Sequence, residues 1–232
     1  LDRSGQSISA FLQPGNYAEA GFTIIDPTIE GTDLPPRGSN KSVSDMGEDY
    51  YFPTAAVKVQ ATDQISLGLL YDQPFGADSQ YASESNAFAT VNTNNGVLEG
   101  TSVEVKTNSI TALIGYQPNE NWNVYAGPVY QTVKAKVSLR GTAYKGPQVL
   151  GGYDIDLKEN EAYGWLAGFA YSIPEIALKA AVTYRSEIKH ELDTTETFRF
   201  GTDGALYIPG LTGSIPTYHK AEITTPQSVN ID

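Results

Sequence analysis

The chain has 232 residues, with 15 Lys and Arg against 27 Asp and Glu, and a formal net charge of −12 at pH 7. This balance does not supply a basic surface for nucleic-acid phosphates, so we expect no nucleic-acid partner. The absence of cysteine excludes disulfides, cysteine-based zinc sites and thiol nucleophiles.

No apolar run approaches the roughly 20 residues that a membrane-spanning helix needs. Mean hydropathy is −0.29. A transmembrane strand exposes only alternate side chains to lipid, so a membrane barrel has the overall hydropathy of a water-soluble protein. The 15 Tyr and 22 Gly fit strands, turns and aromatic interface girdles better than a helical bundle.

Alternation of apolar and polar residues predicts about eight strands, several longer than the five or six residues common in soluble sheets. The clearest is Ile176–Leu192, where one face is mostly apolar and the other mostly charged, a separation that a helix would not produce. The others, in chain order, are Asn16–Glu30, Tyr51–Ala61, Gln64–Tyr71, Thr101–Tyr116, Trp122–Leu139, Ala162–Tyr171 and Tyr218–Ile231.

Short and long connections alternate between these strands. Thr62-Asp63, Gln117–Asn121 and Ser172–Glu175 are tight turns. The long polar connections between them are Gly31–Glu48, Ala77–Gly100, Gly141–Asn160 and Asp193–Pro216. This alternation predicts an all-β, antiparallel transmembrane β-barrel with periplasmic turns and extracellular loops. A soluble β-sandwich mixes loop lengths but does not require strict alternation.

Aromatic residues agree with a barrel. Tyr163, Trp165, Phe169 and Tyr171 share one face of a predicted strand and lie near its two ends, as interface anchors would. The alternative is that they are core aromatics of a sandwich. The opposite face carries Gly164, Leu166 and Gly168, which are small or apolar.

With the strands placed, the chain resembles the long-chain fatty acid transporter family of Gram-negative outer membranes (the FadL/TodX type). The most specific stretch is Ala181–Lys189, which reads AVTYRSEIK. Supporting stretches are Leu1–Gln6, Asn16–Glu19, Val129-Tyr130 and Ala162–Gly168.

The resemblance implies a fourteen-stranded barrel of which this chain holds about eight strands. It also implies that a ligand enters from outside, binds in apolar pockets and leaves sideways into the bilayer through a gap at a kinked third strand. Here the third predicted strand is followed by Pro74, Phe75 and Gly76, where proline and glycine weaken strand pairing. The alternative is that the strand ends there at its loop.

The predicted organisation is a short N-terminal segment, 1–15, followed by a partial barrel, 16–232, truncated at its C-terminus. The segment stands where the resembled family has a plug, but it contains no Asn-Pro-Ala, so it is expected to be a plug remnant at most. We expect a mature exported protein, because no signal peptide is visible. A half-barrel with two unpaired edges is not expected to be stable alone.

A fatty acid carboxylate would require cations in an otherwise apolar cavity. The candidates are Lys134, Lys136 and Arg140, which share one strand face, and Arg185. The alternative is a structural ladder of inward charges, in which Glu187 and Glu191 pair with Arg185 and Lys189.

No catalytic constellation is recognised. His190 and His219 lie outside any nucleophile motif, and Ser186 lies about 13 Å from His190 along a strand. We therefore expect no enzyme activity, no cofactor and no metal site.

The sequence predicts passive transport of long-chain fatty acids or similar hydrophobic compounds by a monomer in the outer membrane of a Gram-negative bacterium, with lateral exit through the barrel wall. Its partners would be these small molecules and membrane lipid. The alternatives are a general porin and a structural or adhesin barrel.

Overall fold

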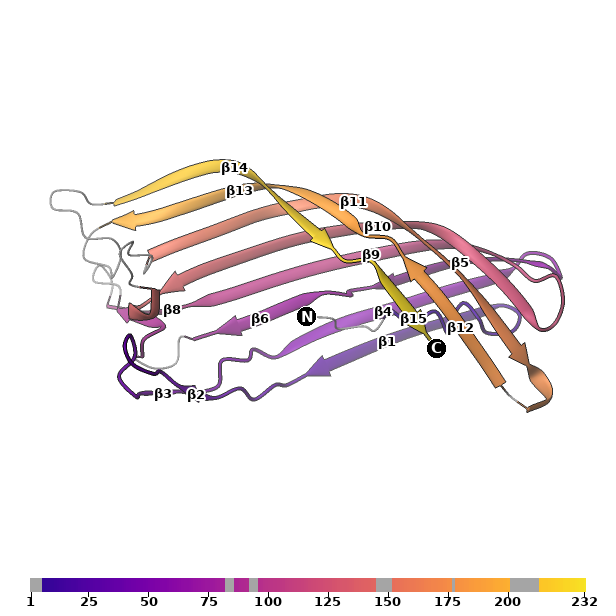
Figure 1. Ribbon diagram of the computed structural model, residues 1–232, viewed down its shortest axis with the longest axis horizontal. Coiled ribbons are helices and arrows are strands. Elements are labelled where there is room, and N and C mark those ends of the chain that lie inside the picture. The colour runs from indigo at the N-terminus through magenta and orange to yellow at the C-terminus, as the bar shows by residue number, and fades with distance from the viewer. Residues whose placement is uncertain (1–5, 82–85, 92–95, 145–151, 177, 201–212) are drawn as a thin grey trace.

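The computed structural model describes residues 6–81, 86–91, 96–144, 152–176, 178–200 and 213–232. Eleven strand segments form one curved antiparallel sheet (Figure 1). The segments are β1 (Tyr17–Ile25), β4 (Tyr50–Gln60), β5 (Ile65–Asp72), β6 (Gly76–Gln80), β9 (Ser102–Tyr116), β10 (Trp122–Arg140), β11 (Gly152–Ile173), β12 (Leu178–Arg185), β13 (Ile188–Phe200), β14 (Gly213–Thr225) and β15 (Ser228–Ile231).

Three pairs of segments are the halves of interrupted strands, namely β5 with β6, β12 with β13, and β14 with β15. The 11 segments therefore make eight wall strands, which confirms the predicted number and the all-β barrel class. Short elements complete the described chain: β2 (Gly31–Thr32), β3 (Ser42–Val43), β7 (Ala89–Val91), β8 (Leu98–Gly100) and the 3-10 turns η1 (Thr142–Tyr144) and η2 (Pro174–Ile176). None of the helices in the described ranges is long and apolar enough to span a membrane.

The predicted short turns lie together at one end of the sheet, and the long connections lie at the other (Figure 1). The strands extend further into the long connections than expected. β11 begins at Gly152 and β13 continues to Phe200, inside the predicted loops Gly141–Asn160 and Asp193–Pro216. Polar residues can pair in strands that rise above the bilayer, because both faces are then in water. The remaining parts of these loops, 145–151 and 201–212, lie outside the described residues.

The two faces of the sheet have different partners. On β11, Tyr163, Trp165, Phe169 and Tyr171 point away from the concave side and are 37–70% exposed, as a lipid-facing girdle would be. Leu166 points the other way and is fully buried. It belongs to a core cluster that includes Tyr125 and Val129 of β10 together with Ile8, Phe11 and Leu12 of the N-terminal segment.

Glycines make room for this segment on the concave face. A Cβ at Gly68 would lie 2.4 Å from the Phe11 ring, and one at Gly115 would lie 2.9 Å from it. Real side chains do not approach so closely, so the phenyl ring occupies space that any other residue at these positions would fill.

The prediction of one regular strand over Ile176–Leu192 is wrong. The chain forms β12 and β13, separated by Ser186-Glu187. Ala181, Thr183 and Arg185 are buried in β12, whereas Ile188, His190 and Leu192 are buried in β13. The buried positions therefore change from odd-numbered to even-numbered residues, as happens when a β-bulge inserts one extra residue into a strand. Ser186 keeps the backbone of β11 hydrogen-bonded at this interruption. Its N–H donates to Trp165 O (2.9 Å), and its Oγ accepts from Trp165 N–H (3.0 Å).

Asp33 joins two of the long connections. Its Oδ1 accepts hydrogen bonds from the backbone N–H groups of Ser39 (3.0 Å) and Lys41 (2.6 Å). Its Oδ2 accepts one from Ala87 N–H (2.8 Å), 54 residues further along the chain. Desolvation acts to raise the pKa of this carboxyl, but the hydrogen bonds from Lys41, Ser39 and Ala87 outweigh it and hold the pKa below its ordinary value.

We expect Asp33→Asn to loosen this junction, because the amide replaces one acceptor oxygen with an N–H donor. In the full-length protein, trypsin should then cleave after Arg37 or Lys41 roughly threefold faster or more. Asp63→Asn, in a turn at the opposite end, serves as the control. Equal cleavage of both variants would contradict the role of Asp33.

The same carboxyl predicts a pH dependence. A lowered folded-state pKa stabilises the junction above the unfolded pKa, and this stabilisation is lost as pH falls through the folded value. In wild-type protein we therefore expect pepsin cleavage in 31–43 to rise below about pH 4. Asp33→Asn should remove that rise.

Candidate functional site

Three cations of the wall hold the N-terminal segment against the concave face. Phe11, Leu12 and Gln13 donate backbone hydrogen bonds to Ile8, Ser9 and Ala10, which makes a short helical turn. Such a turn leaves its last carbonyls without helical donors.

Two lysines supply donors to these carbonyls, and an arginine binds the segment ahead of the turn. Lys179 Nζ donates to Leu12 O (2.6 Å) and Lys58 Nζ to Gln13 O (2.5 Å). Arg185 donates through its terminal guanidinium nitrogen to Gln6 O (2.7 Å). Lys58 and Arg185 are 3% and 8% exposed. Buried cations at this depth require acceptors, and peptide carbonyls meet that requirement.

A cavity of about 150 Å³ lies between this segment and the wall. Ser7 and Ala10 line it from the segment, and Leu70 and Thr111 line it from β5 and β9. Its charged lining residues are Glu19, Asp72 and Arg185. Arg185, predicted as a ligand residue, therefore reaches both the segment and the cavity.

Strand pairing in the wall is interrupted beside this cavity. The register between β4 and β5 ends at Ala55–Tyr71. Beyond it β6 is paired with β9, and among the described strands it is not paired with β4. Contact resumes at an isolated bridge between Gly47 and Ser79. We call the intervening stretches, 48–54 and 72–78, the wall gap.

Pro74, Phe75 and Gly76 lie in the wall gap. Pro74 is fully buried and has no N–H to donate. Thr107 of β9 compensates, because its Oγ1 accepts from Phe75 N–H (2.9 Å) and donates to Phe75 O (2.6 Å). The third strand therefore bends here and continues as β6, rather than ending at its loop.

A second proline, which was not predicted to take part, flanks this gap. Pro53 of β4 stands on the opposite side, where the strand keeps β1 as its partner and has lost β5. Prolines within sheets occur where a ladder hydrogen bond is not needed. A proline on each side of the gap could therefore have indicated from the sequence that pairing is interrupted here. Lys58 and Lys179 were also missed, because nothing in the sequence places the N-terminal segment beside them.

Arg140 is not part of the cavity. It lies at the loop end of β10, with its side chain 5% exposed, and forms ion pairs with Glu99 (3.1 Å) and Asp154 (2.8 Å). Arg199 of β13 pairs with the same two carboxylates at 3.0 and 2.9 Å. Two arginines and two acids thus form a closed ring joining β8, β10, β11 and β13, and Arg140 is engaged in structure.

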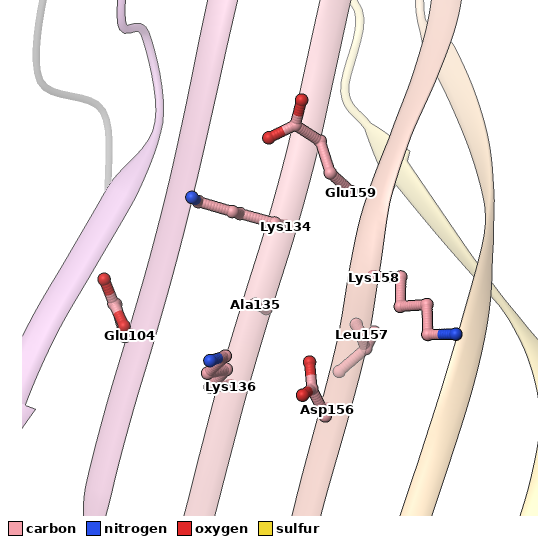
Figure 2. A pocket seen from close by; sticks show the side chains of 8 residues that line it. All are labelled: Glu104, Lys134, Ala135, Lys136, Asp156, Leu157, Lys158 and Glu159. Atoms are coloured by element: carbon pink, nitrogen blue, oxygen red, sulfur yellow. The ribbon is translucent and has the colours of Figure 1, made fainter.

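Lys134 and Lys136 face the outside, contrary to the inward orientation predicted for ligand residues. Like Trp122 and Tyr130, they are even-numbered residues of β10, whose side chains face outward. The inward-facing residues of β10, such as Val133, are odd-numbered. Figure 2 shows Lys136 between Glu104 on β9 and Asp156 on β11, its register partners. Polar side chains alternate here as regularly as they would in a lumen, so the sequence could not distinguish the two faces.

Across the part of the chain that the structure describes, no group of three or more His, Asp or Glu side chains is arranged to hold a metal ion. His190 is fully buried, with Nε2 3.1 Å from Gln131 Oε1, whereas Ser186 forms its hydrogen bonds with Trp165.

Comparisons with known proteins agree with this architecture. The sequence model of the family described as outer membrane protein transport protein (OMPP1/FadL/TodX) matches residues 7–232. No curated protein matches the chain.

Two solved structures share the fold. The toluene transporter TbuX of Ralstonia pickettii superposes with a TM-score of 0.59 at 13% identity over 96% of this chain and 59% of its own. The toluene transporter TodX of Pseudomonas putida gives 0.60 at 12% identity over 98% of this chain and 59% of its own. The chain therefore spans about three-fifths of the length of each.

We expect Arg140→Gln to destabilise the loop end of the wall by about 1–3 kcal/mol, because it leaves two carboxylates with one cation between them. Arg199→Gln, whose side chain is 34% exposed, should cost less than about 1 kcal/mol. Hydrogen exchange of β10 and β11 amides in the full-length protein measures both. If Arg140→Gln instead leaves exchange unchanged and weakens ligand binding, Arg140 is a ligand residue.

Proposed function

Since the chain belongs to the OMPP1/FadL/TodX family of outer membrane transport proteins, we propose that it carries long-chain fatty acids or similar hydrophobic compounds across the outer membrane of a Gram-negative bacterium. Transport is passive, and the compound leaves sideways through the wall gap. The observation that supports this best is the position of the gap. Asp72 belongs both to the gap and to the lining of the lumenal cavity, so the two adjoin.

The bend at Pro74–Gly76 serves as the exit in this proposal. Hydrocarbon solvates broken ladders poorly, so an interruption within the membrane requires local compensation. Thr107 supplies that compensation on the β9 side while β4 and β6 remain apart.

The N-terminal segment argues against the general porin. Ile8, Phe11 and Leu12 are buried in a core cluster with residues of β9, β10 and β11. A wide aqueous channel requires an open, water-filled lumen. Here the apolar side chains of the segment pack across the concave side, beside buried polar residues such as Thr111 and Gln131. In this proposal the segment acts as a short plug.

Arg185 gives the carboxylate of a fatty acid a place to bind. It is the cation among the described lining residues of the cavity, and a guanidinium binds carboxylates in bidentate fashion. Glu19 and Asp72 would disfavour a carboxylate elsewhere in the cavity. Neutral compounds of the toluene type would not use this interaction.

The test of transport is growth. The full-length protein should restore growth on long-chain fatty acids in a host that lacks its own transporter. The double variant Pro74→Thr, Gly76→Val should fold and reach the surface normally but transport several-fold more slowly, because a restored donor and a β-branched residue favour regular pairing. Each restored hydrogen bond is worth about 1 kcal/mol.

Two outcomes would redirect the proposal. Normal transport by a correctly folded double variant would exclude lateral exit at this site. Large, steady single-channel conductance by the wild-type protein, with no growth, would favour the porin.

Substrate class is tested at Arg185. We expect Arg185→Gln to reduce fatty acid uptake about tenfold while leaving uptake of a neutral hydrocarbon within about twofold, because one charge-assisted interaction is lost. Lys179→Gln is the matched control, since it also releases the N-terminal segment but does not line the cavity. Equal losses for both substrates in Arg185→Gln would leave Arg185 with a structural role alone.

A further inference from the structure

The outer face of β9–β11 carries a charged groove at the height of the outer-leaflet headgroups. The groove has a volume of about 360 Å³. Its rim is charged (Figure 2), and the other two residues that line it, Ala135 and Leu157, belong to the buried core cluster on the lumenal side of the wall. The rim residues are Lys134, Lys136, Lys158, Glu104, Asp156 and Glu159.

The height of the groove follows from the aromatic residues below it. Trp122 contacts Tyr171 at the turn end of the outer face, with ring centroids 4.9 Å apart. Tyr130 contacts Tyr163 eight residues further along β10, at 5.4 Å. Eight residues span about 26 Å along a strand and about 20 Å of height at a tilt near 40°. This agrees with the apolar band between the two aromatic girdles of an outer-membrane barrel.

Lys134 and Lys136 lie four and six residues beyond Tyr130, toward the long loops. By the same geometry they stand about 10–15 Å above the upper girdle. The outer leaflet of a Gram-negative outer membrane carries the phosphorylated glucosamines of lipopolysaccharide at this depth, with their acyl chains against the apolar band.

The two lysines are available to a ligand. Among the described residues neither has a carboxylate within 4 Å, whereas Lys106, on the adjacent strand, forms an ion pair with Glu104. Lys134 stands opposite Lys106 in the register, which brings positive charges together, and Lys136 stands opposite Glu104 and Asp156. Lys158 points away from both lysines, toward β13 (Figure 2).

The charge balance of the groove defines its ligand. Three lysines and three acids line the rim, so the groove has no net charge with which to attract small anions over a distance. Binding therefore needs direct contact between ammonium groups and a phosphate, together with acyl chains on the apolar wall below. Only an amphiphile with a phosphate headgroup offers both.

We propose that this groove binds a phosphate of the lipid A moiety of lipopolysaccharide, with Lys134 and Lys136 as the phosphate ligands. The lipid's acyl chains lie on the outer face of β10 and β11, along Tyr130, Tyr163 and Trp165. The carboxylates of the rim exclude a second phosphate and accept hydrogen bonds from sugar hydroxyl groups.

The test uses the full-length protein in detergent and measures binding of bisphosphorylated lipid A by native mass spectrometry. The double variant Lys134→Gln, Lys136→Gln should bind at least about tenfold more weakly, because two charge-assisted contacts are lost. Lys189→Gln, Lys220→Gln is the matched control. It removes the same formal charge from exposed positions on β13 and β14 and should stay within about twofold of wild type.

Lipid A lacking both phosphates should bind the wild-type protein as weakly as bisphosphorylated lipid A binds the lysine double variant. Unchanged binding in that variant overturns the proposal. So does equal binding of phosphatidylethanolamine, or full displacement by millimolar inorganic phosphate, since either would remove the requirement for a phosphorylated glycolipid. Heat-dependent gel migration shows whether each variant is folded. If the double variant fails to fold, the single variant Lys134→Gln replaces it and should bind lipid A about threefold more weakly than wild type.

Discussion

The lipid bilayer offers no hydrogen bonds, and the rest of this structure depends on that constraint. Every backbone N–H and C=O within the membrane needs a partner in the protein, which is why the chain forms an antiparallel sheet of long strands. The informative positions are those where the ladder breaks. At Phe75 the hydroxyl of Thr107 both accepts and donates, and at Trp165 the hydroxyl of Ser186 takes the place of a carbonyl. In both cases a short polar side chain lets a strand bend without leaving its backbone unsatisfied.

The same constraint explains the cations inside. Lys58 and Arg185 are expensive to bury, but each donates to a carbonyl of the N-terminal segment, as the exposed Lys179 also does. The cations thereby become satisfied and the segment becomes fixed. The packing of Phe11 against Gly68 and Gly115 then fills the space between. The segment is held in the lumen by three polar contacts and by the burial of Ile8, Phe11 and Leu12.

The two faces of the wall differ in their side chains. Inside lie the apolar packing, the cavity and the wall gap that the proposed transport would use. Outside, aromatic residues mark the height of the bilayer and charged residues begin above it. Because inward and outward positions alternate along every strand, one bulge exchanges the faces. The bulge at Ser186-Glu187 does so in the seventh wall strand and brings Arg185 and Ile188, three residues apart, both to the lumenal side.

The sequence by itself determined the barrel class, the eight wall strands and the side on which the short turns lie. These features depend on local alternation and on turn residues, which neighbouring residues specify. It also indicated the weak point at Pro74–Gly76, because proline cannot donate to a ladder wherever it stands. Only the tertiary structure decided which face of β10 is outside, and it placed Lys134 and Lys136 on the outer face instead of in the lumen. It alone showed that Arg140 belongs to an ion-pair ring and that Arg185 reaches a cavity. Those assignments depend on residues up to 179 positions apart, such as Arg185 and Gln6, and a period of two cannot report which partner lies across the barrel.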